Sequence, residues 1–117
     1  MKEIYYKPFG PTIGKFSLSG KMISTVNTYA KKIIEDKQKS KALDNSHRLA
    51  GNVKQQFRLT RDFLLKSGLE KKLNRTIESY YKNVIQVKIS SIKIDRAWIV
   101  RQFAGDFNPP HIHRGNV

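Results

Sequence analysis

Two histidines at alternate positions, His111 and His113, are the residues whose type and spacing are best suited to binding a metal ion. In an extended segment, residues two apart face the same side and lie roughly 6–7 Å apart along the strand. The two imidazole rings can therefore converge on one ion, and imidazole is a ligand for Fe(II), Zn, Cu and Ni. Because two protein ligands do not make a stable site, the sequence predicts a metal site to which this pair contributes only part.

The remaining candidates for metal binding are weaker. The third histidine, His47, lies in a polar loop next to Arg48, where we expect a surface role. Asp106 is the nearest carboxylate, but an Asp-Phe-Asn sequence before proline is typical of a turn. Short motifs such as His-x-His also arise by chance, so a pair of exposed histidines that bind no metal is the alternative interpretation. No catalytic or cofactor-binding residue is predicted.

The elements that must position the histidines precede them directly. Residues 97–104 are rich in β-formers and predict a strand, and residues 105–108 predict a turn. Pro109 and Pro110 then keep the following residues extended. Upstream, apolar residues alternate with polar ones over 87–95 and predict another strand, although the apolar face switches midway. In the polar region 40–59, we expect one short extended piece within 49–57.

Helices are predicted in the first two thirds of the chain. Apolar residues recur at helical spacing from Met22 to about Lys37, and Ser19 can cap this helix. A second helical region covers residues 63–84, with a break near Ser67-Gly68. Residues 4–18 predict a short strand and turns. Helices before antiparallel strands indicate an α+β fold, with two main helices packed on an antiparallel sheet.

The length of 117 residues predicts one domain over 1–117, with a helical part in 1–84 and strands in 85–117. The net charge is +14, from 23 Lys and Arg against 9 Asp and Glu. This excess favours contact with nucleic acid or another polyanion. The lysines are scattered over the helical part, so the attraction would not be sequence-specific. A solvated basic surface is the alternative interpretation.

The composition also limits location. No apolar run approaches the roughly 20 residues that a membrane helix needs, and the first residues lack the apolar segment of a signal peptide. Cysteine is absent, which excludes disulfides and thiolate chemistry. We therefore expect a cytoplasmic protein without membrane contact.

The stretch from Ala97 to His113 resembles a signature of phage-type and marine bacterial 2-oxoglutarate/Fe(II)-dependent oxygenases, relatives of the prolyl-hydroxylase-like group. In these proteins a strand with Trp and Val leads into an Asp-(Tyr/Phe)-Asn-Pro turn and then His-x-His. Residues 8–14 and 49–55 are also similar to such proteins. The resemblance touches most of the chain, and residues 97–113 carry nearly all of its specificity.

The resemblance implies the N-terminal part of a double-stranded β-helix, or jelly-roll, with helices on one side. It implies that His111 is an iron ligand and that His113 stands where relatives usually hold Asp or Glu. It also implies Fe(II) with 2-oxoglutarate as cosubstrate, and a hydroxylase-type oxidation of an unknown substrate. No position matches the family's distal histidine or the basic residue that pairs with 2-oxoglutarate. We therefore expect a truncated chain that is inactive alone.

The leading hypothesis is thus the N-terminal portion of such an oxygenase, whether a fragment, a shortened gene product or one piece of a split protein. An incomplete β-helix has an open sheet edge, which favours self-association or pairing with a second polypeptide. The alternative is a small basic protein with a degenerate oxygenase fold that binds nucleic acid or serves phage structure or assembly, in the host cytoplasm if phage-encoded. A third hypothesis is an unrelated α+β domain with a chance His-x-His.

Overall fold

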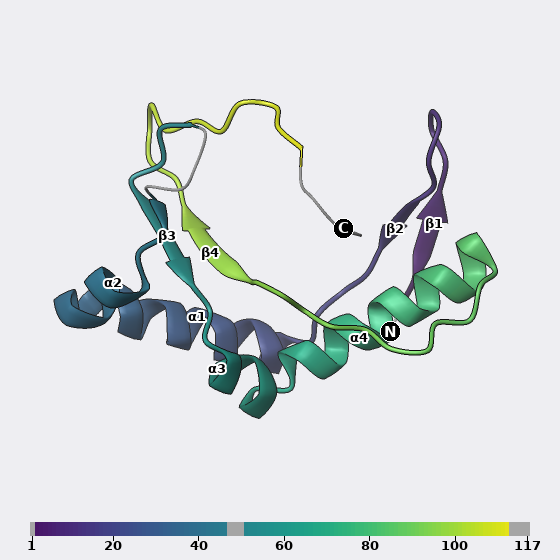
Figure 1. The fold of residues 1–117 in the computed structure, drawn as a ribbon, viewed down its shortest axis with the longest axis horizontal. Helices are drawn as coiled ribbons and strands as arrows, with labels where there is room; N and C mark the ends of the chain where they lie inside the picture. The colour runs from purple at the N-terminus through teal and green to yellow at the C-terminus, as the bar shows by residue number, and fades with distance from the viewer. Residues whose placement is uncertain (1, 47–50, 113–117) are drawn as a thin grey trace. The chain divides into compact units, whose positions relative to one another are not determined.

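The computed structural model describes residues 2–46 and 51–112. These residues form helices and two small antiparallel sheets, so the fold is α+β, as predicted (Figure 1). They divide into two compact units that are each discontinuous in sequence. The first unit holds the described residues up to Thr28 and Thr60–Asp95, and the second holds those of Tyr29–Leu59 and from Arg96 onward. One domain over the whole chain stays a prediction.

The first unit begins with a β-hairpin, in which β1 (Ile4–Tyr6) pairs with β2 (Ile13–Lys15). Tyr5 stands opposite Gly14 in this pair. A Cβ atom on Gly14 would lie 2.8 Å from the ring of Phe16 and 3.0 Å from the ring of Tyr80. The missing side chain therefore lets aromatic rings from the hairpin and from the long helix of this unit approach one another closely.

Helices α3 (Arg61–Lys66) and α4 (Leu69–Tyr80) follow in the same unit. The Thr60 hydroxyl caps α3 by accepting a hydrogen bond from the backbone N–H of Phe63 at 3.2 Å. Gly68 separates the two helices and has a φ of +79°, a left-handed conformation that glycine adopts without strain. The predicted break near Ser67-Gly68 is confirmed.

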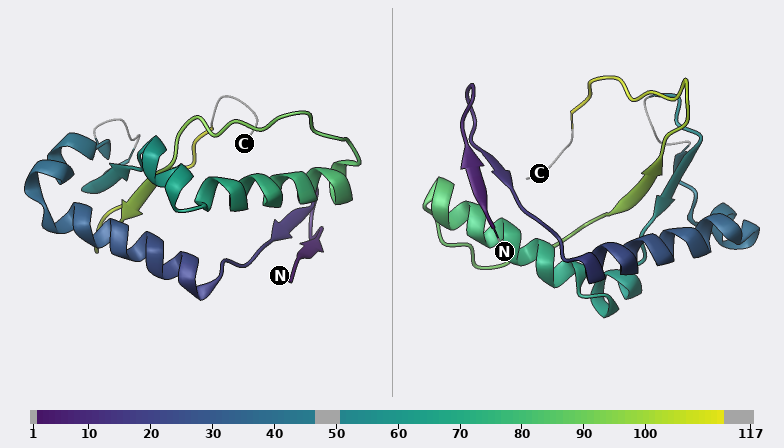
Figure 2. Two further views of the ribbon diagram at one scale, coloured as in Figure 1. Left: turned by 90° about the horizontal axis from the view of Figure 1, so that it is seen from below. Right: turned by 180° about the vertical axis from the view of Figure 1, so that it is seen from behind.

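Helix α4 ends in one π-helical turn, Tyr81–Ile85. The N–H of Gln86 donates to the carbonyl of Tyr81 at 2.7 Å, and Gln86 itself has a φ of +62°. The chain then runs back along α4 (Figure 2). The strand predicted over 87–95 is wrong, because these residues have no regular secondary structure and pair with no strand. Alternation of side chains alone does not form a strand when no neighbouring backbone completes the hydrogen bonds.

Polar contacts fasten the hairpin to α4. The hydroxyls of Tyr5 and Ser79 share a hydrogen bond of 2.9 Å, and Ser79 Oγ donates to Glu3 Oε2 at 2.8 Å. The Tyr80 hydroxyl donates to the carbonyl of Thr12 at 2.6 Å. These bonds join residues at the start of the chain to residues about 70 positions later.

Helix α1 (Gly20–Glu35) begins close to the predicted position, and Ser19 Oγ caps it by accepting from the N–H of Met22 at 3.1 Å. The sequence predicts no helix between about Lys37 and residue 63, but a second helix, α2 (Lys37–Leu43), follows α1 at once. This prediction is wrong because Asp36 starts a new helix: its carboxylate accepts from two backbone N–H groups of the first turn.

The sheet of the second unit joins β3 (Gln55–Arg58) to β4 (Trp98–Arg101) in antiparallel register, with Phe57 opposite Ile99. The strand predicted over 97–104 is thus confirmed in its first half. The buried apolar side chains of this unit are Ile33, Val53, Phe57 and Leu59. Among the residues that the structure describes, no helix is both long enough and apolar enough to cross a bilayer.

Candidate metal centre

The chain turns directly after β4, and Asp106 holds this turn closed. The N–H of Asp106 donates to the carbonyl of Phe103 at 2.9 Å, and Gly105 between them has a φ of +87°, as the third residue of a type II turn requires. Asp106 Oδ2 in turn accepts from the N–H of Phe103 at 3.0 Å. The interpretation of Asp106 as a turn residue is confirmed.

A second set of hydrogen bonds ties this turn to the segment that leads into β3. The N–H of Asn52 donates to the carbonyl of Phe107 at 2.9 Å, and the N–H of Phe107 donates back to Asn52 at 3.0 Å. The N–H of Lys54 lies 3.5 Å from Asp106 Oδ2. The short extended piece predicted within 49–57 is present in its described residues, and it anchors the chain just before the double proline.

Gly51 makes this anchoring possible. A Cβ atom on Gly51 would lie 2.1 Å from the carbonyl oxygen of Phe107, 2.8 Å from Pro109 Cδ and 2.9 Å from the Cα atom of Asn108. Two of these atoms belong to the backbone, so no side-chain rotation can relieve the contact. Only glycine lets the two backbone segments come this close.

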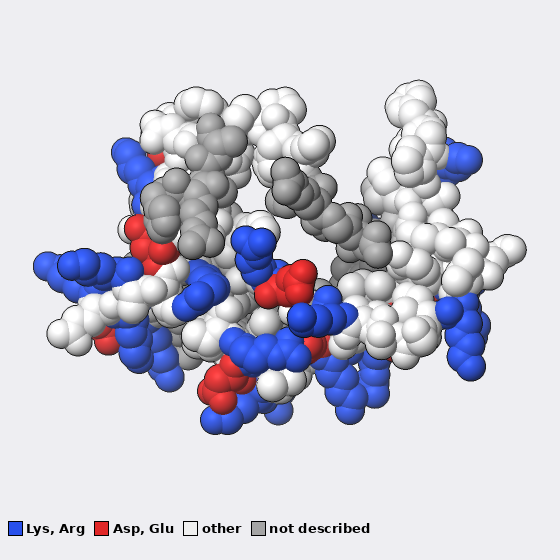
Figure 3. Space-filling model, viewed as in Figure 1, with Lys and Arg blue, Asp and Glu red and all other residues white. Residues whose placement is uncertain are grey.

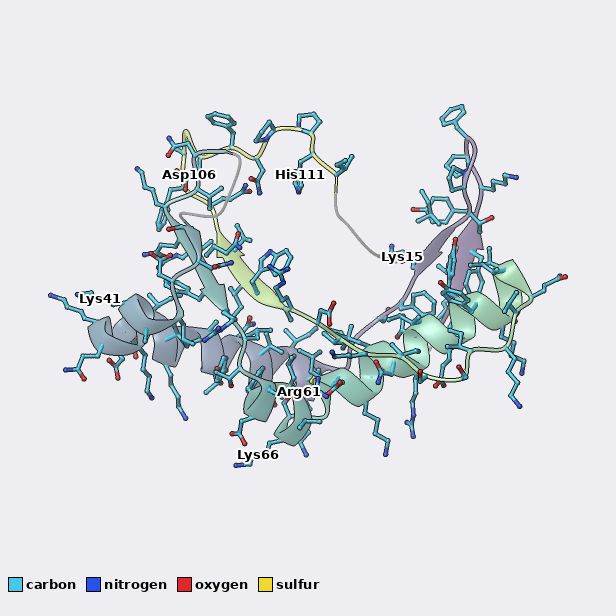
Figure 4. The ribbon with its side chains drawn as sticks, viewed as in Figure 1. Lys15, Lys41, Arg61, Lys66, Asp106 and His111 are labelled. Carbon is cyan, nitrogen blue, oxygen red and sulfur yellow. The ribbon has the colours of Figure 1, made fainter. Side chains whose placement is uncertain are left out.

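His111 follows this anchored segment and is exposed (Figure 4). Its Nδ1 atom lies 2.8 Å from the carbonyl oxygen of Pro109. A carbonyl only accepts hydrogen bonds, so this contact requires a proton on Nδ1. In the neutral ring the unprotonated nitrogen is then Nε2, which is the atom that can bind a metal.

The structure places only one of the two predicted ligands. His113 and His47 lie outside the described residues. Within 2–46 and 51–112, no group of three or more His, Cys, Asp or Glu side chains is arranged to hold a metal ion. His111 fits one ligand position for iron by its donor chemistry, and the remaining positions would have to be filled from elsewhere.

Most of the residues that position His111 could not be predicted from the sequence. In the sequence, Gly51 and Asn52 form an ordinary turn-forming pair. The neighbouring residues give no indication that this pair contacts a backbone segment more than 50 positions later. The only signal was a glycine beside a run that predicts an extended segment, since such glycines often mark the close approach of another backbone.

Comparisons with family models, with curated proteins and with solved structures gave no match to this chain.

Proposed function

We propose that this chain provides part of the iron centre of a 2-oxoglutarate/Fe(II)-dependent oxygenase, with His111 and His113 as protein ligands. The observation that carries the proposal is the contact of 2.8 Å between His111 Nδ1 and the carbonyl oxygen of Pro109. Histidines that ligate metals almost always donate their second ring N–H to a carbonyl or carboxylate, which fixes the tautomer and the ring orientation.

The surrounding backbone supports the same proposal. The order of strand, Asp-Phe-Asn-Pro turn and His-x-His is the order of the oxygenase signature that residues 97–113 resemble. Two hydrogen bonds between Asn52 and Phe107 hold this segment beside β3. A ligand must be held by a rigid neighbourhood if it is to bind iron in one geometry.

In the proposed enzyme, β3 and β4 are early strands of a double-stranded β-helix, and this sequence is its N-terminal part. In the described part of the chain, β4 pairs with β3 on one side and with no strand on the other. A sheet of two short strands is marginally stable alone. A further strand, from the same fold or from a second polypeptide, would complete it at β4.

Iron with bound 2-oxoglutarate and dioxygen would supply the oxidising chemistry, the hydroxylation of a C–H bond. The role of this chain would be to present Nε2 of His111 to the ion, with Nδ1 held by Pro109. The group that anchors 2-oxoglutarate and the remaining iron ligand would come from outside the described residues. Because no position of this sequence matches the family's distal histidine or the basic residue that pairs with 2-oxoglutarate, we expect no turnover by this polypeptide alone.

Nuclear magnetic resonance can test the proposal, because the chain has only three histidines and each ring can be followed separately. Under anaerobic titration with Fe(II), the ring signals of His111 and His113 should broaden at iron concentrations that leave His47 unchanged. The ¹⁵N shifts of His111 should show the proton on Nδ1.

His111→Ala should abolish the selective broadening of His113, and His47→Ala is the matched control that should preserve it. Equal broadening of all three rings, or no broadening of His111, would contradict the proposal. A proton on Nε2 of His111 in the metal-free protein would remove the observation on which the proposal rests.

A further inference from the structure

Five lysines lie within the eleven residues 31–41, at the end of α1 and along α2 in the second unit. All five are exposed, and Figure 3 shows Lys and Arg side chains at this end of the helices as well as at other places on this face. Lys41 extends away from the end of α2 (Figure 4). We call four of them the lysine corner: Lys32, Lys37, Lys39 and Lys41.

The acidic residues of this segment form no ion pair with the lysine corner. Glu35 pairs with Lys31, at 3.8 Å, and that lysine lies outside the corner as defined. The Asp36 carboxylate accepts hydrogen bonds from the N–H groups of Gln38 and Lys39, at 3.0 and 3.1 Å, and so serves as the cap of α2. Among the described residues, none of the four corner lysines forms an ion pair.

The junction that carries the corner is fixed by local contacts. The hydroxyl of Ser40 donates to the carbonyl of Ile33, which ties α2 back to the end of α1. The N–H of Ser40 donates to the carbonyl of Asp36 at 2.8 Å. Ile33 itself is 2% exposed. The four lysines therefore project from a backbone with a defined course, and a bound partner would not have to order it.

The chemistry of the corner favours a partner rich in phosphate. Lysine is a point charge on a flexible stem, suited to phosphate groups without geometric selection. A membrane-binding helix would present exposed aromatic or leucine side chains beside its lysines. Across residues 31–43, the structure shows no exposed large hydrophobic side chain. Protein interfaces are depleted in lysine and have an apolar centre, which this surface lacks.

We propose that the lysine corner binds the phosphate backbone of nucleic acid without reading its sequence. Each phosphate that a lysine neutralises changes the slope of log Kobs against log[salt] by about −0.9. Four such contacts give a slope of about −3.6, or roughly a hundredfold loss of affinity between 50 and 200 mM salt. This surface is separate from His111 and does not depend on the proposed iron centre.

The test measures the fluorescence anisotropy of a labelled 20-base-pair DNA duplex of random sequence, titrated with the full chain between 20 and 200 mM salt. One variant changes all four corner lysines to glutamine, which has a similar helix propensity. A control variant removes the same charge from exposed positions in the first unit: Lys71→Gln, Arg75→Gln, Lys82→Gln and Lys88→Gln. Circular dichroism establishes that both variants keep their helices.

The corner variant should reduce the magnitude of the salt slope by about 3.6 and weaken binding at 50 mM salt at least thirtyfold. The control should change both quantities by less than half as much, and His111→Ala should leave them unchanged. Equal losses in the two charge variants would overturn the proposal, since net charge alone would then explain binding. Tighter binding to phosphatidylserine vesicles than to the duplex, at equal phosphate concentration, would overturn it in favour of a membrane.

Discussion

Gly51→Ala should detach the segment that carries His111 from the segment that leads into β3. The new Cβ atom would lie 2.1 Å from the carbonyl oxygen of Phe107, which must therefore move by more than 1 Å to reach an ordinary contact distance. That movement breaks the two hydrogen bonds between Asn52 and Phe107, now 2.9 and 3.0 Å long.

The expected cost follows from those two bonds. Each contributes about 1 kcal/mol net, so their loss costs about 2 kcal/mol. Alanine also restricts the unfolded chain, which offsets about 0.4–1 kcal/mol. For local opening of these two hydrogen bonds, 2 kcal/mol corresponds to a roughly thirtyfold larger open population, because each 1.4 kcal/mol is a factor of about ten.

Amide hydrogen exchange is the direct assay, because the N–H groups of Asn52 and Phe107 are the donors of these two bonds. Both should exchange roughly thirtyfold faster in Gly51→Ala, while the amides of α4 stay protected. Gly20→Ala is the matched control, since a Cβ atom at Gly20 meets nothing within 4 Å. Unchanged exchange at both amides in a folded Gly51→Ala variant would refute the close approach.

Two further changes test the first unit by urea unfolding. Tyr80→Phe removes the hydrogen bond of 2.6 Å to the carbonyl of Thr12 and should lower the free energy of unfolding by about 1–2 kcal/mol. Tyr81→Phe is the control, because the Tyr81 hydroxyl makes no hydrogen bond within the described residues; it should change this free energy by less than about 0.5 kcal/mol. Similar effects of the two tyrosine changes would contradict the role of Tyr80. Gln86→Gly should stabilise by about 0.5–1 kcal/mol, because Gln86 has a φ of +62°. Gln38→Gly, which places glycine inside helix α2, should instead destabilise the protein by about 1 kcal/mol. A loss of stability in Gln86→Gly would refute the argument from the positive φ of Gln86.

Elements with local causes were predictable from the sequence. The apolar stripe after Ser19 predicts α1, and the Ser19 hydroxyl does cap it. The break before α4 follows from Gly68, whose left-handed conformation separates two helices. The β-forming residues before Gly105 predict β4, and the turn at Asp106 follows from side-chain chemistry that acts over three residues.

Features that depend on distant partners, or on a weak local signal, were not predicted correctly. The alternation over 87–95 predicts a strand, but a strand needs a neighbour, and the sequence does not say whether one is present. Helix α2 has no apolar stripe, so its polar residues do not predict a helix. Only Asp36, a residue that can cap a helix, indicated that one begins there. The role of Gly51 depends on a backbone more than 50 residues away.

The interleaving of the two units bears on how the chain acquires its structure during synthesis. The bonds from Tyr5 and Glu3 to Ser79, and from Thr12 to Tyr80, span 74, 76 and 68 residues. The N-terminal hairpin therefore leaves the ribosome long before its partner helix exists. The sheet of the second unit also forms late in synthesis, because β3 can pair only after β4 has been synthesised. Neither half of the chain can fold as an independent continuous piece, and shortened versions expressed from either end should be sensitive to proteolysis.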